Sequence, residues 1–316
     1  MYLLRNKKIL LVISIMLMVS LALVGCGGGN TTDEISTGEN GEPANTNGGN
    51  ITIGAKNFTE SILLGNIFKV LIEEKTDINV TVTELGGTMI AFEALKNNDI
   101  QMYPEYTGTG YITILGHEEI LSPEETYEIV KNEFREEWNF EWLSELGFNN
   151  TYTLSLRQDS IEELGIKTFS DLVNVAGELK LGATMEFVER QDGLPGLNQA
   201  YGFEFGDVID LDPGLMYTAV KEEQVDVITA FATDGRIPAF NLGILEDDLN
   251  FFPPYFAAPL VRGDLLEQYP ELINILNELE GKINDDTMAQ LNYTVDESAR
   301  SEEAVAREFL ESIGLI

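Results

Sequence analysis

One pattern occurs twice in this chain, 125 positions apart, and it limits the folds that the chain can adopt. Residues 90–109 contain a helix-like segment, a short polar turn, a buried-strand pattern, an aromatic residue and a polar loop, and residues 216–234 repeat this series. Lys96 aligns with Lys221, and Tyr106 aligns with Phe231. The repeat predicts two similar lobes with equivalent aromatic residues at the ends of equivalent strands.

The position of these two rings points to a ligand site. In open α/β sheets, ligands bind outside the carboxyl ends of the strands. Tyr106 and Phe231 are therefore expected on opposite walls of one cleft between the lobes.

The rest of the chain alternates strand and helix patterns, which favours α/β layers with parallel strands. Strands are expected at residues 51–54, 78–85, 100–103, 151–156, 179–183 and 208–211. A helix through residue 72 is expected to be capped by Asn57, with Glu60 three positions later, and another to open at residues 86–88. Further helices are expected at residues 169–175, 196–201, 215–221, 270–282, 285–291 and 302–313.

The order of these elements predicts a discontinuous first lobe. We expect lobe one to comprise residues 51–150 and 252–316, and lobe two to comprise residues 151–251. The aromatic and proline-rich residues 251–255 interrupt regular structure and are expected to return the chain to lobe one. Two such crossovers are natural hinges for closure around a ligand.

The N-terminus is predicted to be a targeting segment. Residues 1–26 begin with basic side chains and continue with an apolar run at 9–24, which is short for a membrane span and typical of a signal peptide. The small residues before Cys26 resemble a bacterial lipobox, in which the cysteine is lipidated and a diacyl group anchors it stably. An uncleaved transmembrane anchor is the alternative. Residues 27–50 have the composition of a flexible tether.

Composition excludes several functions. With 19 basic and 54 acidic residues the formal charge is −35, so the surface should repel nucleic acid and anionic membrane faces. His117 is the only histidine, which disfavours a Ser-His-Asp enzyme and a multi-histidine metal site. We expect no catalytic residues, no metal and no cofactor.

Seven motifs resemble one family when they are taken together. They are residues 56–60, 86–88, 103–109, 147–152, 212–217, 233–237 and 252–255. In this order they resemble the substrate-binding proteins of osmoprotectant ABC importers, which take up glycine betaine, choline, carnitine and related quaternary amines. The resemblance covers residues 51–316. It implies a two-lobe, periplasmic-binding-protein-like (type II) α/β fold, a monomeric extracytoplasmic receptor anchored to the membrane, and an ABC permease with its ATPase as partner.

The resemblance also implies the ligand site. The trimethylammonium cage would consist of Tyr106, Tyr152, Phe231 and Tyr255. The ligand carboxylate would be bound by Lys56, Thr109 and Arg190. Phe231 stands where family members often have tyrosine, and Asn150, a possible ligand contact, stands where some have aspartate. A direct counter-charge for the cation is therefore missing at residue 150.

These residue types suit a quaternary ammonium betaine. Such a cation has no N–H group to donate, and aromatic faces attract it at little desolvation cost. At the other end, Arg190 can form two parallel N–H bonds to a carboxylate, and Lys56 adds a point charge. These two cations rank glycine betaine above choline, and a ligand that bridges the lobes would favour their closed form.

Three other functions remain open on the sequence. A receptor for an amino acid or another polar solute would need buried partners for the N–H groups of its ligand. An enzyme could use the same architecture, although the chain has no recognisable base–nucleophile pair, P-loop or cofactor motif. A structural lipoprotein or adhesin would bind no small molecule.

Overall fold

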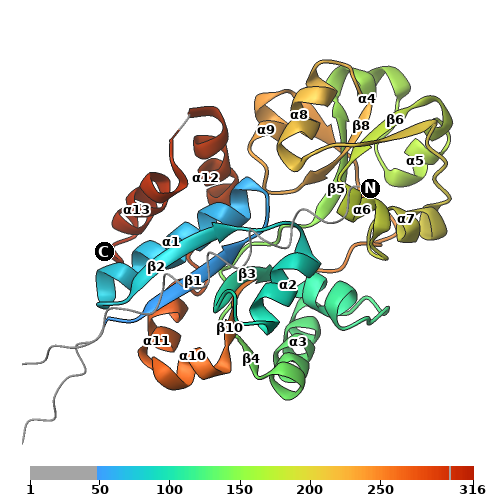
Figure 1. The fold of residues 1–316 in the computed structure, drawn as a ribbon. Helices are drawn as coiled ribbons and strands as arrows, with labels where there is room; N and C mark the ends of the chain where they lie inside the picture. The colour runs from blue at the N-terminus through green and yellow to red at the C-terminus, as the bar shows by residue number, and fades with distance from the viewer. Residues whose placement is uncertain (1–47, 299) are drawn as a thin grey trace, which may run out of the picture. The chain divides into compact units, whose positions relative to one another are not determined.

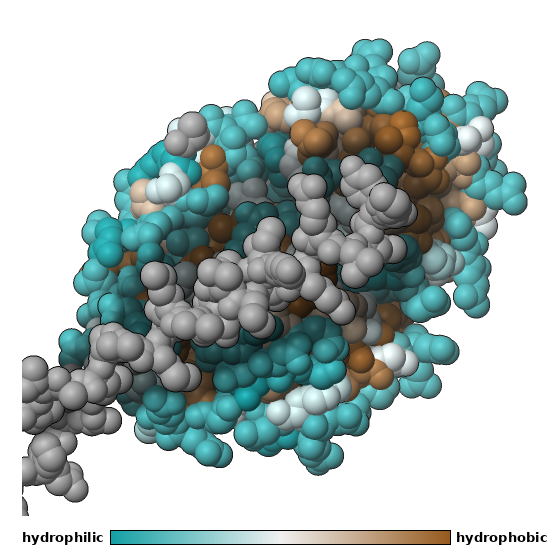
Figure 2. Space-filling view, in the orientation of Figure 1, coloured by the Kyte–Doolittle hydropathy of each residue, from teal (hydrophilic) through white to brown (hydrophobic). Residues whose placement is uncertain are grey.

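The structure is a computed structural model that describes residues 48–298 and 300–316 (Figure 1). The predicted signal segment, Cys26 and most of the predicted tether lie outside the described residues. None of the helices in the described part combines the length and the apolar character that crossing a membrane requires. Figure 2 shows a largely hydrophilic face, as the acidic composition predicts, with apolar colour gathered near α6 and α8, where Met185 and Leu215 are exposed.

The first sheet contains five strands in the order β2-β1-β3-β10-β4. These strands are β1 (Asn50–Ala55), β2 (Asn79–Glu84), β3 (Met102–Tyr106), β4 (Phe140–Trp142) and β10 (Ala257–Arg262). Its helices are α1 (Thr59–Lys75), α2 (Thr88–Lys96), the π-helix η1 (Thr109–Ile114), α3 (Pro123–Trp138), α10 (Gly263–Gln268), α11 (Glu271–Asn277), α12 (Asp285–Ser298) and α13 (Glu302–Ser312). Strands β1, β2 and β3 are parallel, whereas β10 runs antiparallel to β3 and β4.

The second sheet has the order β7-β6-β8-β5-β9. Its strands are β5 (Tyr152–Arg157), β6 (Lys180–Ala183), β7 (Asp207–Asp210), β8 (Val227–Phe231) and β9 (Leu242–Ile244). The helices between them are α4 (Gln158–Leu164), α5 (Phe169–Val173), the 3₁₀ helix η2 (Ala176–Glu178), α6 (Met185–Glu189), α7 (Leu194–Tyr201), α8 (Pro213–Lys221) and α9 (Arg236–Ala239). Strand β5 is antiparallel to β8, so both sheets are mixed and not purely parallel as the alternation predicts.

The predicted repeat is present with matching boundaries. Helices α2 and α8 begin at residues 88 and 213, and strands β3 and β8 begin at residues 102 and 227, each pair 125 positions apart. In each sheet this strand is the central one. It pairs with a parallel strand on one side, β1 or β6, and with an antiparallel strand on the other, β10 or β5. Tyr106 and Phe231 are the last residues of β3 and β8, as the alignment predicts.

Two segments connect the sheets and pair with each other. One precedes β5 and the other precedes β10, and Asn149 forms an isolated antiparallel bridge with Phe256. The backbone N–H of Asn150 donates to the carbonyl of Tyr255 at 3.1 Å, and the N–H of Tyr255 donates to Oδ1 of Asn149 at 2.7 Å. The connections therefore form one paired strip beside the cleft.

Helix α1 is buried on most of its surface, and the prediction that Asn57 caps it is wrong. Leu63, Leu64 and Ile67 are fully buried, because the first sheet and helices α11 to α13 all pack against this helix. The helix begins at Thr59 after Phe58 and has no side-chain cap, so Asn57 does not cap it. Its Glu60 side chain is instead bonded to residues of other elements.

Other boundaries differ from the predictions by a few residues. Strand β3 starts at Met102, two residues after the predicted start, and its buried pattern continues to Tyr106, beyond the predicted residue 103. Helix α11 ends at Asn277, short of the predicted residue 282, and α12 continues to Ser298, beyond the predicted residue 291. Periodicity located these helices, but tertiary packing set their ends.

Candidate functional site

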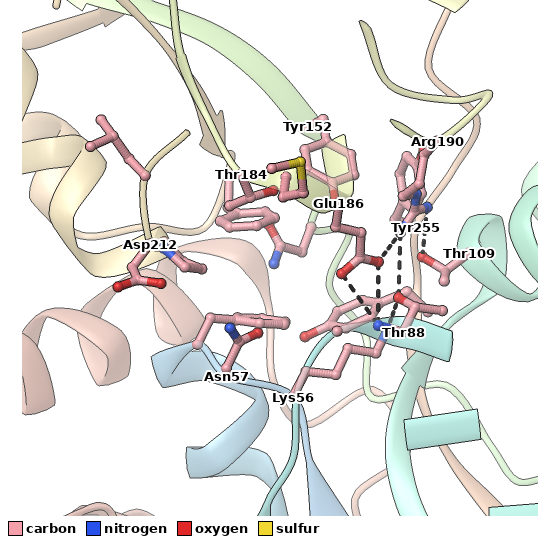
Figure 3. Close-up of a pocket in the computed structure, with 18 of the residues that line it drawn as sticks. Lys56, Asn57, Thr88, Thr109, Tyr152, Thr184, Glu186, Arg190, Asp212 and Tyr255 are labelled. Atoms are coloured by element: carbon pink, nitrogen blue, oxygen red, sulfur yellow. Dashed lines mark hydrogen bonds and ion pairs between the residues drawn. The ribbon is translucent and has the colours of Figure 1, made fainter. Parts of the chain in front are cut away.

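A cavity of about 260 Å³ is lined by residues from both sheets and both connections (Figure 3). All eight residues predicted for the site lie on its wall: Lys56, Tyr106, Thr109, Asn150, Tyr152, Arg190, Phe231 and Tyr255. The structure therefore brings together side chains that are up to 199 positions apart, from 56 to 255. The wall divides into an aromatic end and an ionic end.

The aromatic end consists of five rings in contact. Phe58 lies 6.2 Å from Tyr106 and stacks on Phe231 at 5.3 Å, measured between ring centroids. Tyr152 lies 5.2 Å from Phe231 and 5.8 Å from Tyr255, to which it is nearly perpendicular. These rings form one contiguous aromatic wall of the cavity.

Strand register places the rings of this wall. Tyr152 opens β5 directly opposite Phe231 at the end of β8. In the first sheet, Tyr106 pairs with Ala257. Tyr255 lies in the connection, two residues before Ala257. The second sheet therefore supplies two rings, the first sheet supplies one, the connection supplies a fourth, and the fifth, Phe58, directly precedes α1.

At the ionic end, Lys56 is buried and already paired. Its Nζ lies 2.5 Å from Oε1 of Glu105, which is also fully buried, and donates to Oγ1 of Thr88 at 3.0 Å. The ammonium also lies 5.4 Å from the ring centroid of Tyr106, so it touches the border of the aromatic end.

Arg190 is likewise bound to carboxylates of the chain. Its Nε donates to Asp192 at 2.7 Å, its Nη1 donates to Glu186 at 3.0 Å, and its Nη2 donates to Oγ1 of Thr109 at 3.3 Å. Asp192 also accepts a hydrogen bond of 2.6 Å from the hydroxyl of Tyr255. Burial raises the pKa of Asp192, but the Arg190 charge outweighs this effect and the pKa is lowered.

Glu186 connects the second sheet to the first. Its carboxylate accepts the backbone N–H of Thr88, at the start of α2, at 3.2 Å, and lies beside Arg190 (Figure 3). A Cβ at Gly87 would approach Oε2 of Glu186 to 2.2 Å, so a side chain at this position would require the Glu186 carboxylate to shift. Burial raises the pKa of Glu186, yet the charges of Lys56 and Arg190 outweigh burial and lower it.

Chain carboxylates therefore occupy the two cations to which the family resemblance assigns a ligand carboxylate. The backbone N–H of Thr88, at the N-terminus of α2, and the guanidinium of Arg190 meet at one point, an arrangement that favours an anion, while Lys56 is paired with Glu105 nearby. In this structure Glu186 supplies that anion. The cavity lining as a whole carries Lys56 and Arg190 against Glu186, Asp210 and Asp212.

Sequence reasoning missed three of the residues that shape this site. Phe58 and Thr88 lie within motifs that carry the family resemblance, so a closer reading of those motifs could have found them. Glu186 lies in a short helix, and its position four residues before Arg190 is the one spacing that could have indicated this ion pair. The described residues contain no group of three or more side chains placed to hold a metal ion.

Comparisons with known proteins agree with this geometry. Residues 49–312 match the sequence model of the family described as the substrate binding domain of ABC-type glycine betaine transport systems. The chain is 37% identical, over 97% of both proteins, to a carnitine transport binding protein of Listeria monocytogenes. It is 35% identical to a glycine-betaine-binding protein of Pseudomonas aeruginosa, over 82% of this chain and 86% of that protein.

The fold has a similar counterpart among solved structures. A structure described as a glycine betaine/carnitine/choline ABC transporter shares 32% identity, covers 84% of this chain and 99% of its own, and superposes with a TM-score of 0.69. The two mixed sheets thus form the predicted type II periplasmic-binding-protein fold.

Proposed function

Because the chain belongs to the family of substrate-binding domains of ABC-type glycine betaine transport systems, we propose that it captures glycine betaine or carnitine and delivers it to a permease. This family consists of extracytoplasmic binding components of ABC importers and not of enzymes. The observation that carries the proposal is the wall of five contacting rings in a cavity between the two sheets.

The trimethylammonium group is proposed to lie against Tyr106, Tyr152, Phe231 and Tyr255. Phe58, which stacks on Phe231, would complete this surface. Each aromatic face contributes roughly 0.5–2 kcal/mol to the binding of a desolvated cation. A primary ammonium would have to give up its hydrated N–H groups here, so the cage selects for methylation.

The carboxylate of the ligand is proposed to take the position that Glu186 occupies. The N–H of Thr88, the guanidinium of Arg190 and the ammonium of Lys56 would then bind it, and Glu186 would turn toward solvent. Its side chain is 30% exposed, which gives it room to leave. A choline ligand, which has no carboxylate, would leave Glu186 in place.

Ligand capture is proposed to bring two lobes together. Lobe one comprises residues 51–150 and 252–316, and lobe two comprises residues 151–251. Contacts already cross between the sheets, since Arg190 donates to Thr109 and Glu186 accepts from Thr88. A ligand bridging both ends of the cavity would favour the closed arrangement, which the permease would recognise.

We also propose that Cys26 carries the lipid anchor of a monomeric receptor. The lipobox-like residues before it and the tether-like composition after it support this role. Mass spectrometry of the membrane fraction should find a diacylated N-terminal cysteine, and Cys26→Ala should release the protein from the membrane. An unmodified Cys26 with a retained leader would favour the uncleaved anchor instead.

Calorimetric titration with glycine betaine, carnitine, choline, proline and glycine tests the proposed function. We expect measurable binding of the methylated ligands, with betaine above choline, and no binding of proline or glycine. Tight binding of an amino acid without binding of betaine would instead support a polar-solute receptor. The absence of any ligand-dependent thermal shift would support a structural lipoprotein.

A further inference from the structure

A carboxylate lies directly behind the aromatic end of the cavity. Glu60, in the first turn of α1, is only 3% exposed. It lines a second cavity of about 170 Å³ that shares Phe58, Asn150 and Phe231 with the ligand cavity. Glu60 is thus separated from the ligand cavity by the residues of the cage wall.

Four neutral groups donate hydrogen bonds to Glu60. Oε1 accepts from the hydroxyl of Tyr106 at 2.7 Å and from Nδ2 of Asn150 at 2.8 Å. Oε2 accepts from Nδ2 of Asn292 at 2.9 Å and from the hydroxyl of Thr233. The two amide groups donate and the two hydroxyls can donate as well, so the contacts can satisfy an ionised carboxylate.

No cation balances this carboxylate within the part of the chain that the structure describes. Glu60 forms no salt bridge among these residues. Arg236, the one cation among the described residues lining the second cavity, is bound to Asp234 at 2.9 Å and lies 3.3 Å from Asp296. Since a buried charge without a partner is costly, Glu60 would gain from a cation at the cage.

We propose that Glu60 is the counter-charge of the bound quaternary ammonium and acts through Tyr106 and Asn150. This inference rests on the proposed function. Tyr106 presents its ring to the ligand cavity while its hydroxyl donates to Glu60, so the carboxylate makes the ring more electron-rich and adds its own field. Asn150 passes a second hydrogen bond from the cavity wall to the same oxygen.

This arrangement resolves the missing charge at residue 150. A carboxylate at that position would contact the ligand directly and would have to lose its hydration for a cation that has no N–H group to donate. Glu60 is already desolvated and hydrogen-bonded, so the methyl groups can pack on the rings while its charge acts through one layer of atoms. Glu60 is therefore a specificity-determining residue that does not touch the ligand.

The test compares glycine betaine with 3,3-dimethylbutanoate, which has the same shape and carboxylate but a carbon in place of the nitrogen. Calorimetry should give the ratio of their two Kd values for the wild type and for Glu60→Gln. Glu60→Gln is expected to reduce the preference for betaine about tenfold, which corresponds to about 1.4 kcal/mol. Glu74→Gln, at an exposed carboxylate of the same helix, is the matched control and should leave the preference unchanged.

The outcomes separate the possible explanations. An unchanged preference in Glu60→Gln, or equal losses of affinity for both ligands, would overturn the inference, because a merely structural residue affects both ligands alike. A wild type that binds no betaine would overturn the proposed function before any variant is considered.

A second variant decides the question if Glu60→Gln does not fold. Tyr106→Phe keeps the ring and the carboxylate and removes only the hydroxyl that joins them. We expect it to reduce the preference for betaine about threefold, and an unchanged preference in this variant would contradict the inference.

Discussion

The aromatic end of the cavity presents rings without a formal charge among them, whereas the ionic end presents cations that chain carboxylates already bind. At the first end, the hydroxyl of Tyr106 donates to Glu60 behind the wall, and the hydroxyl of Tyr255 donates to Asp192 at the border with the ionic end. At the second end, Glu105, Glu186 and Asp192 lie directly against Lys56 and Arg190. We infer from this difference that the aromatic end suits a cation, while the ionic end can exchange one carboxylate for another.

Removal of a ring from the aromatic end should have the largest effect. Tyr152→Ala deletes a ring that contacts Phe231 and Tyr255, and we expect the Kd for glycine betaine to rise roughly 30-fold, or about 2 kcal/mol. Calorimetry measures this change. Tyr152→Phe keeps the ring face and should stay within a few-fold of the wild type; if the two variants lose equally, the face is not what binds.

Removal of the Arg190 guanidinium should weaken the binding of glycine betaine, which has a carboxylate, more than the binding of choline, which has none. Arg190→Ala leaves Asp192 and Glu186 without their cation, so a ligand carboxylate would meet repulsion there. We expect the Kd for glycine betaine to rise about tenfold more than the Kd for choline, since a charge-assisted contact is lost for betaine alone. Melting temperatures of the free variant control for misfolding, and equal losses for both ligands would argue against a carboxylate clamp.

Neutralisation of Glu186 should act in the opposite direction. Glu186→Gln removes the charge that competes with a ligand carboxylate for Thr88 and Arg190. Competition titrations should show a roughly threefold shift in preference from choline toward betaine, because only a charged competitor must be displaced. Glu189→Gln, in the same short helix and away from the cavity lining, serves as the control. A shift toward choline would mean that Glu186 does not occupy the position of the ligand carboxylate.

The smallest effect concerns stability and pH at the buried carboxylate. Burial raises the pKa of Glu60, and the hydrogen bonds from Thr233, Tyr106, Asn292 and Asn150 offset this only in part. The folded chain therefore holds this proton more tightly than the unfolded chain, and ionisation of Glu60 lowers the free energy of unfolding as pH rises. This decrease in the free energy of unfolding is complete above the raised pKa and absent below the ordinary pKa of glutamate.

Urea denaturation of the ligand-free protein checks this sign. Relative to Glu60→Gln, the wild type should become more stable as pH is lowered through the raised pKa toward the ordinary one. A difference between the two proteins that stays constant over this range would show that Glu60 does not change its ionisation on folding.

Much of the fold could be predicted because the repeat is written in local patterns. The alignment of Lys96 with Lys221 and of Tyr106 with Phe231 located two helices and two strands, and their boundaries differ by the same 125 positions. The antiparallel course of β5 and β10 could not be predicted, because strand direction depends on how the chain crosses between sheets. The prediction that Asn57 caps α1 was wrong, because a local capping pattern does not show that Glu60 forms hydrogen bonds with residues of other elements.

The lining of the cavity could be predicted in part, but its electrostatics could not. Family resemblance supplied eight residues, all of which line this cavity, and missed others such as Phe58, Thr88 and Glu186. It did not show that Lys56 is already paired, because Glu105 meets it only through tertiary structure. The partners of Arg190 are local, since Asp192 lies two positions and Glu186 four positions away in the sequence. The pairing of Glu60 with Tyr106 joins residues 46 positions apart and has no signature in sequence spacing.

A crystal structure with glycine betaine tests the central claim most directly. We predict that the quaternary nitrogen will lie within about 6 Å of the ring centroids of Tyr106, Tyr152, Phe231 and Tyr255, with the ligand carboxylate beside Thr88 and Arg190. A betaine bound elsewhere, or one whose methyl groups contact none of these rings, would contradict the account.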